Sequence, residues 1–541
     1  MVYDFTLPTT SPLSFQSFIS SPTHPSLPQL ASTARYGLYH ALQSHKRLPR
    51  GPRQDAHLQI VLSELNKYIP FLFAISNGLI GRPVRSTIPN GGHESSTQNP
   101  RSGEEIEITI HAEIESAWKP TLSSRNTHTL NLGSISASGN ATNSKGLRKR
   151  GKRVSGRGID FEIGFTLTTL GYVLSQLARV GINESLYATQ TQSTEQRVAA
   201  IQTATRYLLE ASSVHALLTS SPSFTGSTTA GSSAPDIDPT TQSALASLAL
   251  AEATLLAVLK DDAYVAVCIQ ERNPNDKEWM VKAPEIPKVR ALLFARLCVR
   301  AAEYAEQASA GLGSVGSGKN GRLDDEVTRY AEVLSRVARA RACRFFGIDA
   351  ELAAKAGEGI AWLRAARTAL GLRSTGAAPA PGEKSEASSK GGFSRLKREW
   401  AERREEKKIG KSAGGAGRRD KGPLEPGDDA GRDEEGRVIT MLETKWVRTN
   451  DTMNTQPIPP SGPLLSNFPS GRDIHSVPPP YNPASLDGDQ LMRMRAPPEE
   501  TGDAAFFGND PDSDDEDTPA DARGLPGGFP DRSETASTAY Y

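Results

Sequence analysis

The sequence predicts a mostly α-helical protein whose folded part surrounds one buried helix. The stretch Phe161 to Gly181 is apolar on nearly every helical face, which is typical of a helix enclosed by others. Amphipathic segments with helical spacing occur both before and after this stretch. An aromatic content of 6% and a negative mean hydropathy indicate that the helical part is joined to disordered sequence.

The charge balance argues against a general attraction to nucleic acid, which we do not expect as a partner. The 541 residues contain 62 Lys and Arg and 62 Asp and Glu, so any electrostatic attraction has to be local. Cys268, Cys298 and Cys343 lie far apart in helical sequence, as is typical of reduced core residues. The first residues lack the pattern of a signal peptide, and no run of about eighteen apolar residues occurs. We therefore expect a cytoplasmic protein.

The N-terminal region is expected to contain two helices and a half-buried strand. Apolar spacing predicts helices over 30–45 and 55–69, and Pro70 interrupts the second pattern. From 105 to 118, isoleucine and alanine alternate with polar residues as in a strand, and 129–132 could supply a partner. Stretches rich in Gly, Ser, Pro and Asn predict disordered insertions near 83–103, 133–157 and 220–239.

Five more helical segments are predicted after the central one. They share apolar positions at helical spacing, and proline, aspartate or glycine marks several of their ends. Their ranges are 196–218, 241–269, 287–311, 323–346 and 350–372. Long antiparallel helices joined by short loops are compatible with a solenoid-like stack.

The composition changes after Leu372, so we expect a folded domain over 1–373. Residues 374–541 are rich in proline, glycine and charge, and they are expected to be mostly disordered. The charged segment 393–411 is compatible with an exposed helix that carries i,i+4 ion pairs.

A short motif in this tail resembles the ligands of WW domains. Pro478, Pro479, Pro480 and Tyr481 form P-P-x-Y, a polyproline II segment with an aromatic end that suits WW-domain grooves. A WW ligand and a plain proline-rich spacer are equally good interpretations of these residues.

Two segments have a formal likeness to phosphate-binding sequences. The basic run Lys145 to Arg153 could contact phosphate, but it lies in a Gly/Ser-rich loop and a solvated insertion is favoured. Gly311 to Gly321 matches G-x-G-x-x-G and G-x-x-x-x-G-K, which require a preceding strand. The sequence before it is helical, and Asn320 replaces the Walker Ser/Thr, so a flexible interhelical loop is favoured.

No pattern of residues indicates catalysis or a cofactor. The nine histidines have no metal-binding spacing, and C-x-x-C, H-E-x-x-H and G-x-S-x-G motifs are absent from the sequence. We therefore expect neither a metal nor an organic cofactor.

Several stretches, in their order along the chain, resemble the fungal PalC family of ambient-pH signalling proteins, which carry a BRO-type domain. These stretches are YDFTLPTTSPLSFQSFI, LNKYIPFLFAI, AEIESAWKPTLSS, FEIGFTLTTLGYVLSQLAR, GIDAELAAKAGEGIAWLRAARTAL and DTMNTQPIPPSGPLLSNFPSGRDIH. The resemblance implies a boomerang-shaped helical domain with a small antiparallel sheet and tetratricopeptide-like helix pairs.

The same resemblance implies binding of the C-terminal amphipathic helix of an ESCRT-III filament subunit in a shallow groove on the concave face. Ile360 and Leu363 match its anchor positions, although spacing alone favours simple helix packing for both. Val214, His215 and Leu218 match an opposing wall in which an aromatic residue is expected in place of His215. Leu363→Asp is expected to abolish binding without unfolding the domain.

The resulting hypothesis is a non-catalytic adaptor between ESCRT-III, at endosomal or plasma membrane, and the alkaline-pH pathway that activates a zinc-finger transcription factor by proteolysis. Membrane association would then occur only through partners. One alternative is a general endosomal-sorting scaffold whose P-P-x-Y motif recruits a WW-domain ubiquitin ligase. Another is a nucleotide-dependent enzyme that uses the loop Gly311 to Gly321, with Lys319 essential.

Overall fold

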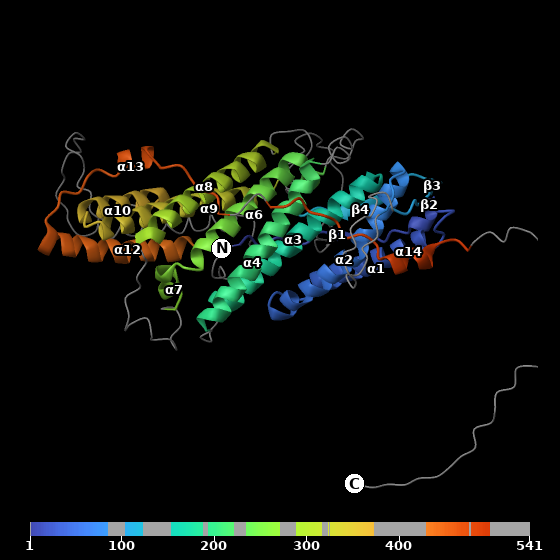
Figure 1. The fold of residues 1–541 in the computed structure, drawn as a ribbon, viewed down its shortest axis with the longest axis horizontal. Helices are drawn as coiled ribbons and strands as arrows, with labels where there is room; N and C mark the ends of the chain where they lie inside the picture. The colour runs from blue at the N-terminus through green and yellow to red at the C-terminus, as the bar shows by residue number, and fades with distance from the viewer. Residues whose placement is uncertain are drawn as a thin grey trace, which may run out of the picture. The chain divides into compact units, whose positions relative to one another are not determined.

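The computed structural model describes residues 2–84, 103–122, 153–187, 193–220, 234–270, 288–315, 323, 325–372, 429–474 and 478–497. Most of these residues lie in helices, so the mostly helical fold class is confirmed (Figure 1). The helices are α1 Leu27–Arg47, α2 Pro52–Ile80, α3 Ile159–Leu186, α4 Thr194–Ser220, α6 Pro239–Leu259, α7 Ala263–Gln270, α8 Lys288–Val315, α9 Asp325–Leu352, α10 Ala356–Leu370, α12 Arg432–Thr449, α13 Gly462–Ser466 and α14 Gly488–Met494. Short 3-10 turns η1 Phe15–Ser17 and η3 Pro235–Ile237 and a π-helical turn η5 Asn450–Asn454 complete the helical elements.

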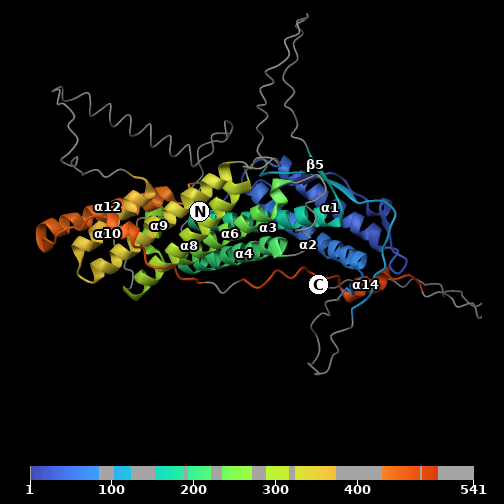
Figure 2. The same cartoon turned by 90° about the horizontal axis from the view of Figure 1, so that it is seen from above.

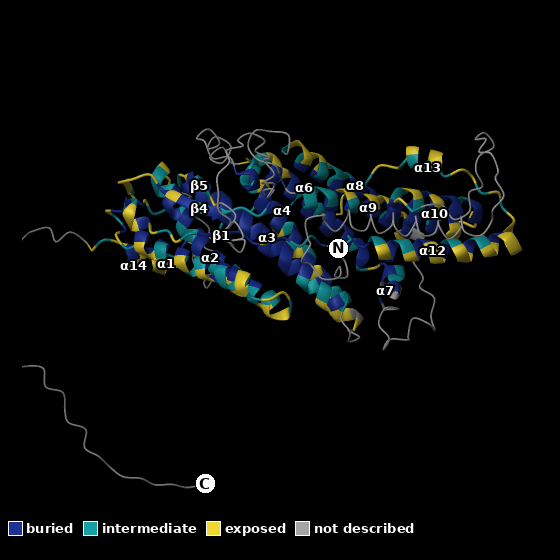
Figure 3. Ribbon diagram, turned by 180° about the vertical axis from the view of Figure 1, so that it is seen from behind, coloured by how far each residue is buried: buried dark blue, intermediate teal, exposed yellow. Residues whose placement is uncertain are grey.

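Helix α3 is the buried centre that the sequence predicts. Every residue from Phe161 to Arg179 is buried, and the helix is dark blue over most of its length in Figure 3. Helix α2 packs on α3, and α4, α6, α8, α9 and α10 then pack one against the next. Gly171 lets α4 approach closely, because a Cβ at this position would overlap the imidazole of His215.

Several helix boundaries differ from the predictions. Helix α9 continues to Leu352 and α10 begins only at Ala356, whereas helices were predicted over 323–346 and 350–372. Helix α2 continues through Pro70 to Ile80, because burial of Leu72 and Ile75 offsets the loss of one helical N–H. The helix predicted over 241–269 is broken into α6 and α7, and the Asp262 carboxylate accepts a hydrogen bond from the Val265 N–H (3.3 Å) at the start of α7.

Helices α2 and α6 are long and apolar enough, by length and composition, to cross a bilayer. However, 50% of the most apolar window of α2 and 78% of that of α6 are buried inside the fold. Burial of this extent is typical of core helices in a bundle.

The strands form two small antiparallel sheets. The first has the order β1 Thr9–Thr10, β4 Glu115–Lys119 and β5 Val154–Arg157, and the second pairs β2 Ile19–Ser20 with β3 Thr109–Ile110. The prediction of one half-buried strand over 105–118 is partly wrong, because the chain leaves β3 after Ile110 and re-enters a sheet as β4 at Glu115. Ser116 and Trp118 of β4 face inward, whereas Ile110 of β3 is exposed. The suggested partner 129–132 lies outside the described residues.

Two predicted disordered insertions contribute ordered residues at their ends. Residues 154–157 form β5, and residues 235–237 form η3, in which the buried Asp236 accepts hydrogen bonds from the N–H groups of Thr121 (2.8 Å) and Leu122 (3.0 Å). Residues 133–152 and 221–233 of these insertions, like residues 85–102, lie outside the described residues.

The packed structure also continues beyond the predicted domain end at residue 373, since Met1–Ala496 form one compact unit. Helix α12 packs on α10, and residues 455–474 and 478–497, which we name the strap, return past α8 to the β2 region (Figure 2). Along this path the N–H of Arg472 donates to the Arg296 carbonyl (3.1 Å), and the N–H of Ala496 donates to the Thr23 carbonyl (2.8 Å). The charged segment 393–411 lies outside the described residues.

Candidate functional site

The five residues expected to bind the partner helix lie in two separate places. Val214, His215 and Leu218 lie on α4, which packs between α3 and α6. Ile360 and Leu363 lie on α10, which packs between α9 and α12. All five side chains are buried, so the structure does not bring them together in one open groove.

Helix α10 is enclosed because elements after residue 428 cover it. The Trp446 ring of α12 lies in a notch made by Gly347 of α9 and Gly359 of α10, at 3.5 and 3.4 Å from where their Cβ atoms would be. The Gly357 N–H donates to the Gln456 side chain of the strap (3.1 Å). The expectation that Leu363→Asp leaves the domain folded is therefore corrected, because this side chain is fully buried and the variant would place a carboxylate in the core.

His215 is a neutral residue that joins three helices. The Gln242 side chain donates to the Thr168 hydroxyl (3.0 Å) and the Asp236 carbonyl (2.5 Å), so its oxygen is the acceptor that faces His215 Nδ1 (2.7 Å). Nδ1 consequently carries the proton and donates. Burial lowers the pKa of His215 to about 4, against the opposing effect of the Gln242 hydrogen bond.

A buried cluster of charges joins α9, α12 and the start of α7. The Glu435 carboxylate accepts from Arg341 Nε (2.9 Å) and Arg344 Nε (2.6 Å), and Arg344 also donates to Asp262 (2.5 Å). All four side chains are fully buried. We name these residues the α9–α12 ion cluster.

A second buried cluster surrounds Glu162 at the start of α3. Its carboxylate accepts from Arg35 of α1 (2.5 Å), Tyr68 of α2 (3.1 Å) and the Trp118 indole of β4 (2.7 Å). Burial raises the pKa of the Tyr68 hydroxyl well above its usual value, and the Glu162 charge adds to this effect. The only strongly polar residue in the first half of the predicted central helix therefore fixes α1, α2 and β4 to α3.

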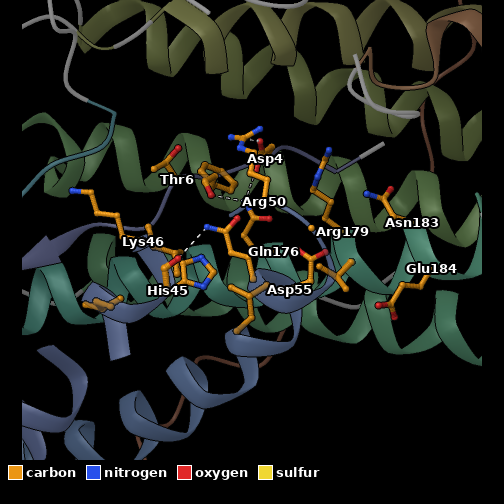
Figure 4. A pocket seen from close by; sticks show the side chains of 17 residues that line it. Asp4, Thr6, His45, Lys46, Arg50, Asp55, Gln176, Arg179, Asn183 and Glu184 are labelled. Carbon is orange, nitrogen blue, oxygen red and sulfur yellow. Dashed lines mark hydrogen bonds and ion pairs between the residues drawn. The ribbon is translucent and has the colours of Figure 1, made fainter. Parts of the chain in front are cut away.

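A crevice of about 240 Å³ lies where the N-terminal segment, α1, α2 and α3 meet (Figure 4). Its lining carries both signs of charge, with Lys46, Arg50 and Arg179 near Asp4 and Glu184. Arg50 forms an ion pair with Asp4 (3.2 Å). Burial, followed by the neighbouring His57, lowers the pKa of His45 to about 4. This balance of charges indicates no particular ligand.

The described residues contain no group of three or more His, Cys, Asp and Glu side chains that could hold a metal ion. The segment Gly311 to Gly321, which matches nucleotide-loop motifs formally, begins inside α8. Because α8 extends to Val315, Gly311 and Gly313 are helical, and the loop predicted from Gly311 begins later than expected. Gly316, Gly318 and Lys319 lie outside the described residues. A helix in place of a strand before these glycines does not provide the geometry of a phosphate-binding loop.

Comparison with known proteins identifies the family. No family model matches the chain. A curated relative, the pH-response regulator protein palC of Emericella nidulans, is 55% identical over 544 residues, which cover all of both chains. The chain belongs to the PalC family of pH-response regulators. The family membership predicted from the sequence is thereby confirmed.

Solved structures that resemble this PalC-family chain include two of ALIX and one of a Bro1 domain. The ALIX BRO1 complex with CHMP4C has a TM-score of 0.48 at 14% identity and covers 90% of this chain and 99% of that one. ALIX in complex with the SIVmac239 late domain has a TM-score of 0.48 at 14% identity, and the match covers 92% of this chain and 51% of that one. A Bro1-domain structure described as a basis for endosomal targeting has a TM-score of 0.44 at 13% identity, and the match covers 91% of this chain and 95% of that one.

The P-P-x-Y motif of this PalC-family chain lies in the strap. Pro479 and Pro480 are exposed, whereas Tyr481 is half-buried against the core. Burial raises the pKa of Tyr481 to about 12, with a further contribution from the charge of Glu210 on α4. The aromatic side chain that a WW groove would take is thus partly covered by the chain's own core.

Sequence reasoning missed the α9–α12 ion cluster. A signal was present, because Arg341 and Arg344 lie three residues apart on an otherwise apolar face of a predicted helix. Two buried arginines require acidic partners. One of these partners, Glu435, lies in the region that the composition assigned to a disordered tail.

Proposed function

We propose that this PalC-family chain is a non-catalytic adaptor of the alkaline-pH signalling pathway. The observation that carries the proposal is the 55% identity to a pH-response regulator along the whole of both chains. Long helices packed side by side present extended surfaces, which suit a protein that holds partners together. The described residues contain no metal-ligand cluster, and no catalytic motif occurs in the sequence.

The proposal includes a partner, the C-terminal amphipathic helix of an ESCRT-III filament subunit, and an outcome, proteolytic activation of a zinc-finger transcription factor. This part is supported by the sequence resemblance to BRO-type proteins. Recruitment to endosomal or plasma membrane would follow from this contact. Val214, His215 and Leu218 are buried and cannot contact the partner helix. On α4 the partner helix would therefore contact accessible neighbouring residues, such as the half-buried Leu217.

Binding can be tested with the full chain and a fluorescently labelled ESCRT-III C-terminal helix, by anisotropy. We expect saturable binding that Leu217→Asp weakens at least tenfold. Leu292→Asp on α8 is a matched control, since Leu292 is 45% exposed and the same charge is introduced there. Absence of saturable binding by the unmodified chain would remove ESCRT-III from the proposal. Unchanged binding by Leu217→Asp would exclude α4 as the contact surface but would leave ESCRT-III as the partner.

The role in the pathway has a separate test. The chain should restore growth at alkaline pH, and proteolytic processing of the transcription factor, in a fungus that lacks its own PalC. Restored processing by a chain that does not bind ESCRT-III would support the pathway role and would exclude ESCRT-III as the partner. Failure to restore processing by a stably expressed chain would refute the pathway role.

A second candidate function is an endosomal-sorting scaffold that recruits a WW-domain ubiquitin ligase. The exposure of Pro479 and Pro480 favours it, whereas the half-buried Tyr481 would have to leave its place against the core. A WW domain should then bind a peptide spanning Pro478 to Tyr481 far more tightly than it binds the full chain. Equal affinities would show that Tyr481 is accessible in the folded protein.

A further inference from the structure

The connection between α1 and α2 carries a group of exposed basic side chains. Lys46, Arg47, Arg50 and Arg53 are all exposed, and we name them the basic tip. Within residues 46–55 the only acidic residue is Asp55. A chain with no net charge overall therefore has a local excess of positive charge at this place.

The basic tip has a fixed geometry. The Gln54 side chain donates to the His45 carbonyl (3.1 Å), and the N–H groups of Gln54 and Asp55 donate to the Gly51 carbonyl (2.9 and 3.1 Å). Gly51 has a φ of +126°, a value that favours glycine. The turn is the exposed end of the hairpin formed by α1 and α2 (Figures 1 and 3). The four cations are consequently held close together at one end of two long helices.

Most of this charge is not neutralised inside the fold. Arg50 is paired with Asp4, but its side chain remains 54% exposed. In the part of the chain that the structure describes, no ion pair involves Lys46, Arg47 or Arg53. The N-terminal end of α2, which begins at Pro52, adds the positive end of a helix dipole.

We propose that the basic tip contacts an anionic phospholipid bilayer directly. A cluster of four or more Lys and Arg residues suffices for attraction to anionic lipids, and a bilayer offers many phosphates to one small area. The exposed Pro49 and Pro52 are apolar and can lie at the level of the headgroups. This contact goes beyond the proposed adaptor function, in which partners alone bring the protein to membranes.

Other ligands suit the basic tip less well. The crevice beside it is lined by Asp4, Asp55 and Glu184, so it is a poor pocket for a single phosphate group. Residues 46–55 contain no aromatic side chain on which a nucleic acid base could stack. A flat, anionic surface is the partner that matches the charge and the chemistry of the tip.

The test is flotation of the full chain with phosphatidylcholine vesicles, with and without phosphatidylserine, at low and physiological salt. We expect binding only to the anionic vesicles. Each neutralised basic residue should weaken binding roughly fivefold, so three together should weaken it on the order of a hundredfold. The tip variant keeps Arg50, which pairs with Asp4, and carries Lys46→Gln, Arg47→Gln and Arg53→Gln.

Two control variants remove the same number of charges elsewhere. One changes exposed residues of α12 that form no ion pair with other described residues, Arg437→Gln, Lys445→Gln and Arg448→Gln. The other changes the basic run before β5, Lys149→Gln, Arg150→Gln and Lys152→Gln. We expect both controls to bind as the unmodified chain does. All substituted positions in the tip are exposed, and unchanged thermal unfolding would confirm that the variant is folded.

Three results would overturn the proposal. The first is an unmodified chain that does not float with anionic vesicles. The second is a folded tip variant that binds as well as the unmodified chain, or a control that loses as much as the tip variant, since either places the attraction elsewhere. The third is binding of single-stranded RNA in place of vesicles, with loss of that binding in the tip variant.

Discussion

Arg344 Nε lies 2.6 Å from Glu435 Oε1 in the core, although 91 residues separate these two residues in the sequence. Arg341 shares the same carboxylate, and neither arginine is exposed. This contact makes α12 part of the core.

Glu435→Ala should lower the free energy of unfolding by about 3–5 kcal/mol, because it leaves two buried guanidinium groups with too little negative charge. Chemical denaturation of the full chain measures this change. Asp433→Ala, at an exposed position in the first turn of the same helix, is the control, with an expected change within about 1 kcal/mol. Similar losses in both variants would show that the charge of α12, and not the buried contact, is responsible.

Leu363→Asp should lower the free energy of unfolding by about 4 kcal/mol or more, since a carboxylate would enter a site with no solvent exposure. Circular dichroism during thermal unfolding measures the effect. Arg364→Gln, at the exposed neighbouring position, removes only the ion pair with Glu443 and should change it by no more than about 1 kcal/mol. A Leu363→Asp protein that unfolds like the unmodified chain would mean that α10 is accessible in solution.

Gly171→Ala should destabilise the protein by about 1–3 kcal/mol, because the added methyl group would overlap the imidazole of His215. Gly181→Ala, on the same helix with open space around it, should be neutral or stabilise the protein by up to about 1 kcal/mol.

A double-mutant cycle tests the cause of the Gly171 effect. In a His215→Ala background the imidazole is absent, so Gly171→Ala should cost less than it does in the unmodified chain. Strictly additive losses would contradict a direct overlap between these two residues.

The stability of the protein should change with pH through Glu252. Burial raises the pKa of this carboxyl to about 7, while the hydrogen bond from the Tyr3 N–H (2.8 Å) opposes the rise. Because the folded state binds the proton more tightly than the unfolded state, this contribution to stability is full below pH 4.5 and is lost as pH rises to about 7.

Glu252→Gln should remove that dependence. The difference in unfolding free energy between the unmodified chain and the variant should change by roughly 3 kcal/mol between pH 4.5 and 7, and stay level above that range. Denaturation curves at a series of pH values measure it. Parallel pH profiles for the two proteins would contradict the raised pKa.

The sequence predicted the elements whose burial is evident from their own residues. Helix α3 is apolar all round, so no tertiary information was needed to place it at the centre. Helix α12 shows the opposite case. Its buried Val438, Ile439, Leu442 and Trp446 form a helical stripe, but charged residues between them and the surrounding composition concealed it.

The candidate site depended on information that the sequence lacks. Ile360 and Leu363 were placed on the correct helix, but whether a helical apolar residue faces a groove or a neighbour depends on which other elements cover it. Here α10 packs between α9 and α12, and α12 comes from sequence beyond residue 428. The same applies to Tyr481, because its sequence does not show that the side chain is half-buried against the core.

The position of Glu435 also affects how the chain can fold during synthesis. When Arg341 and Arg344 leave the ribosome, the carboxylate that they share is still 91 residues away from being made. At a synthesis rate of about 5–20 residues per second, α9 waits roughly 5–18 s with its α12-facing side uncovered. Nascent chains stalled before residue 435 should therefore depend on chaperones to remain soluble, and release from this dependence should coincide with the emergence of α12.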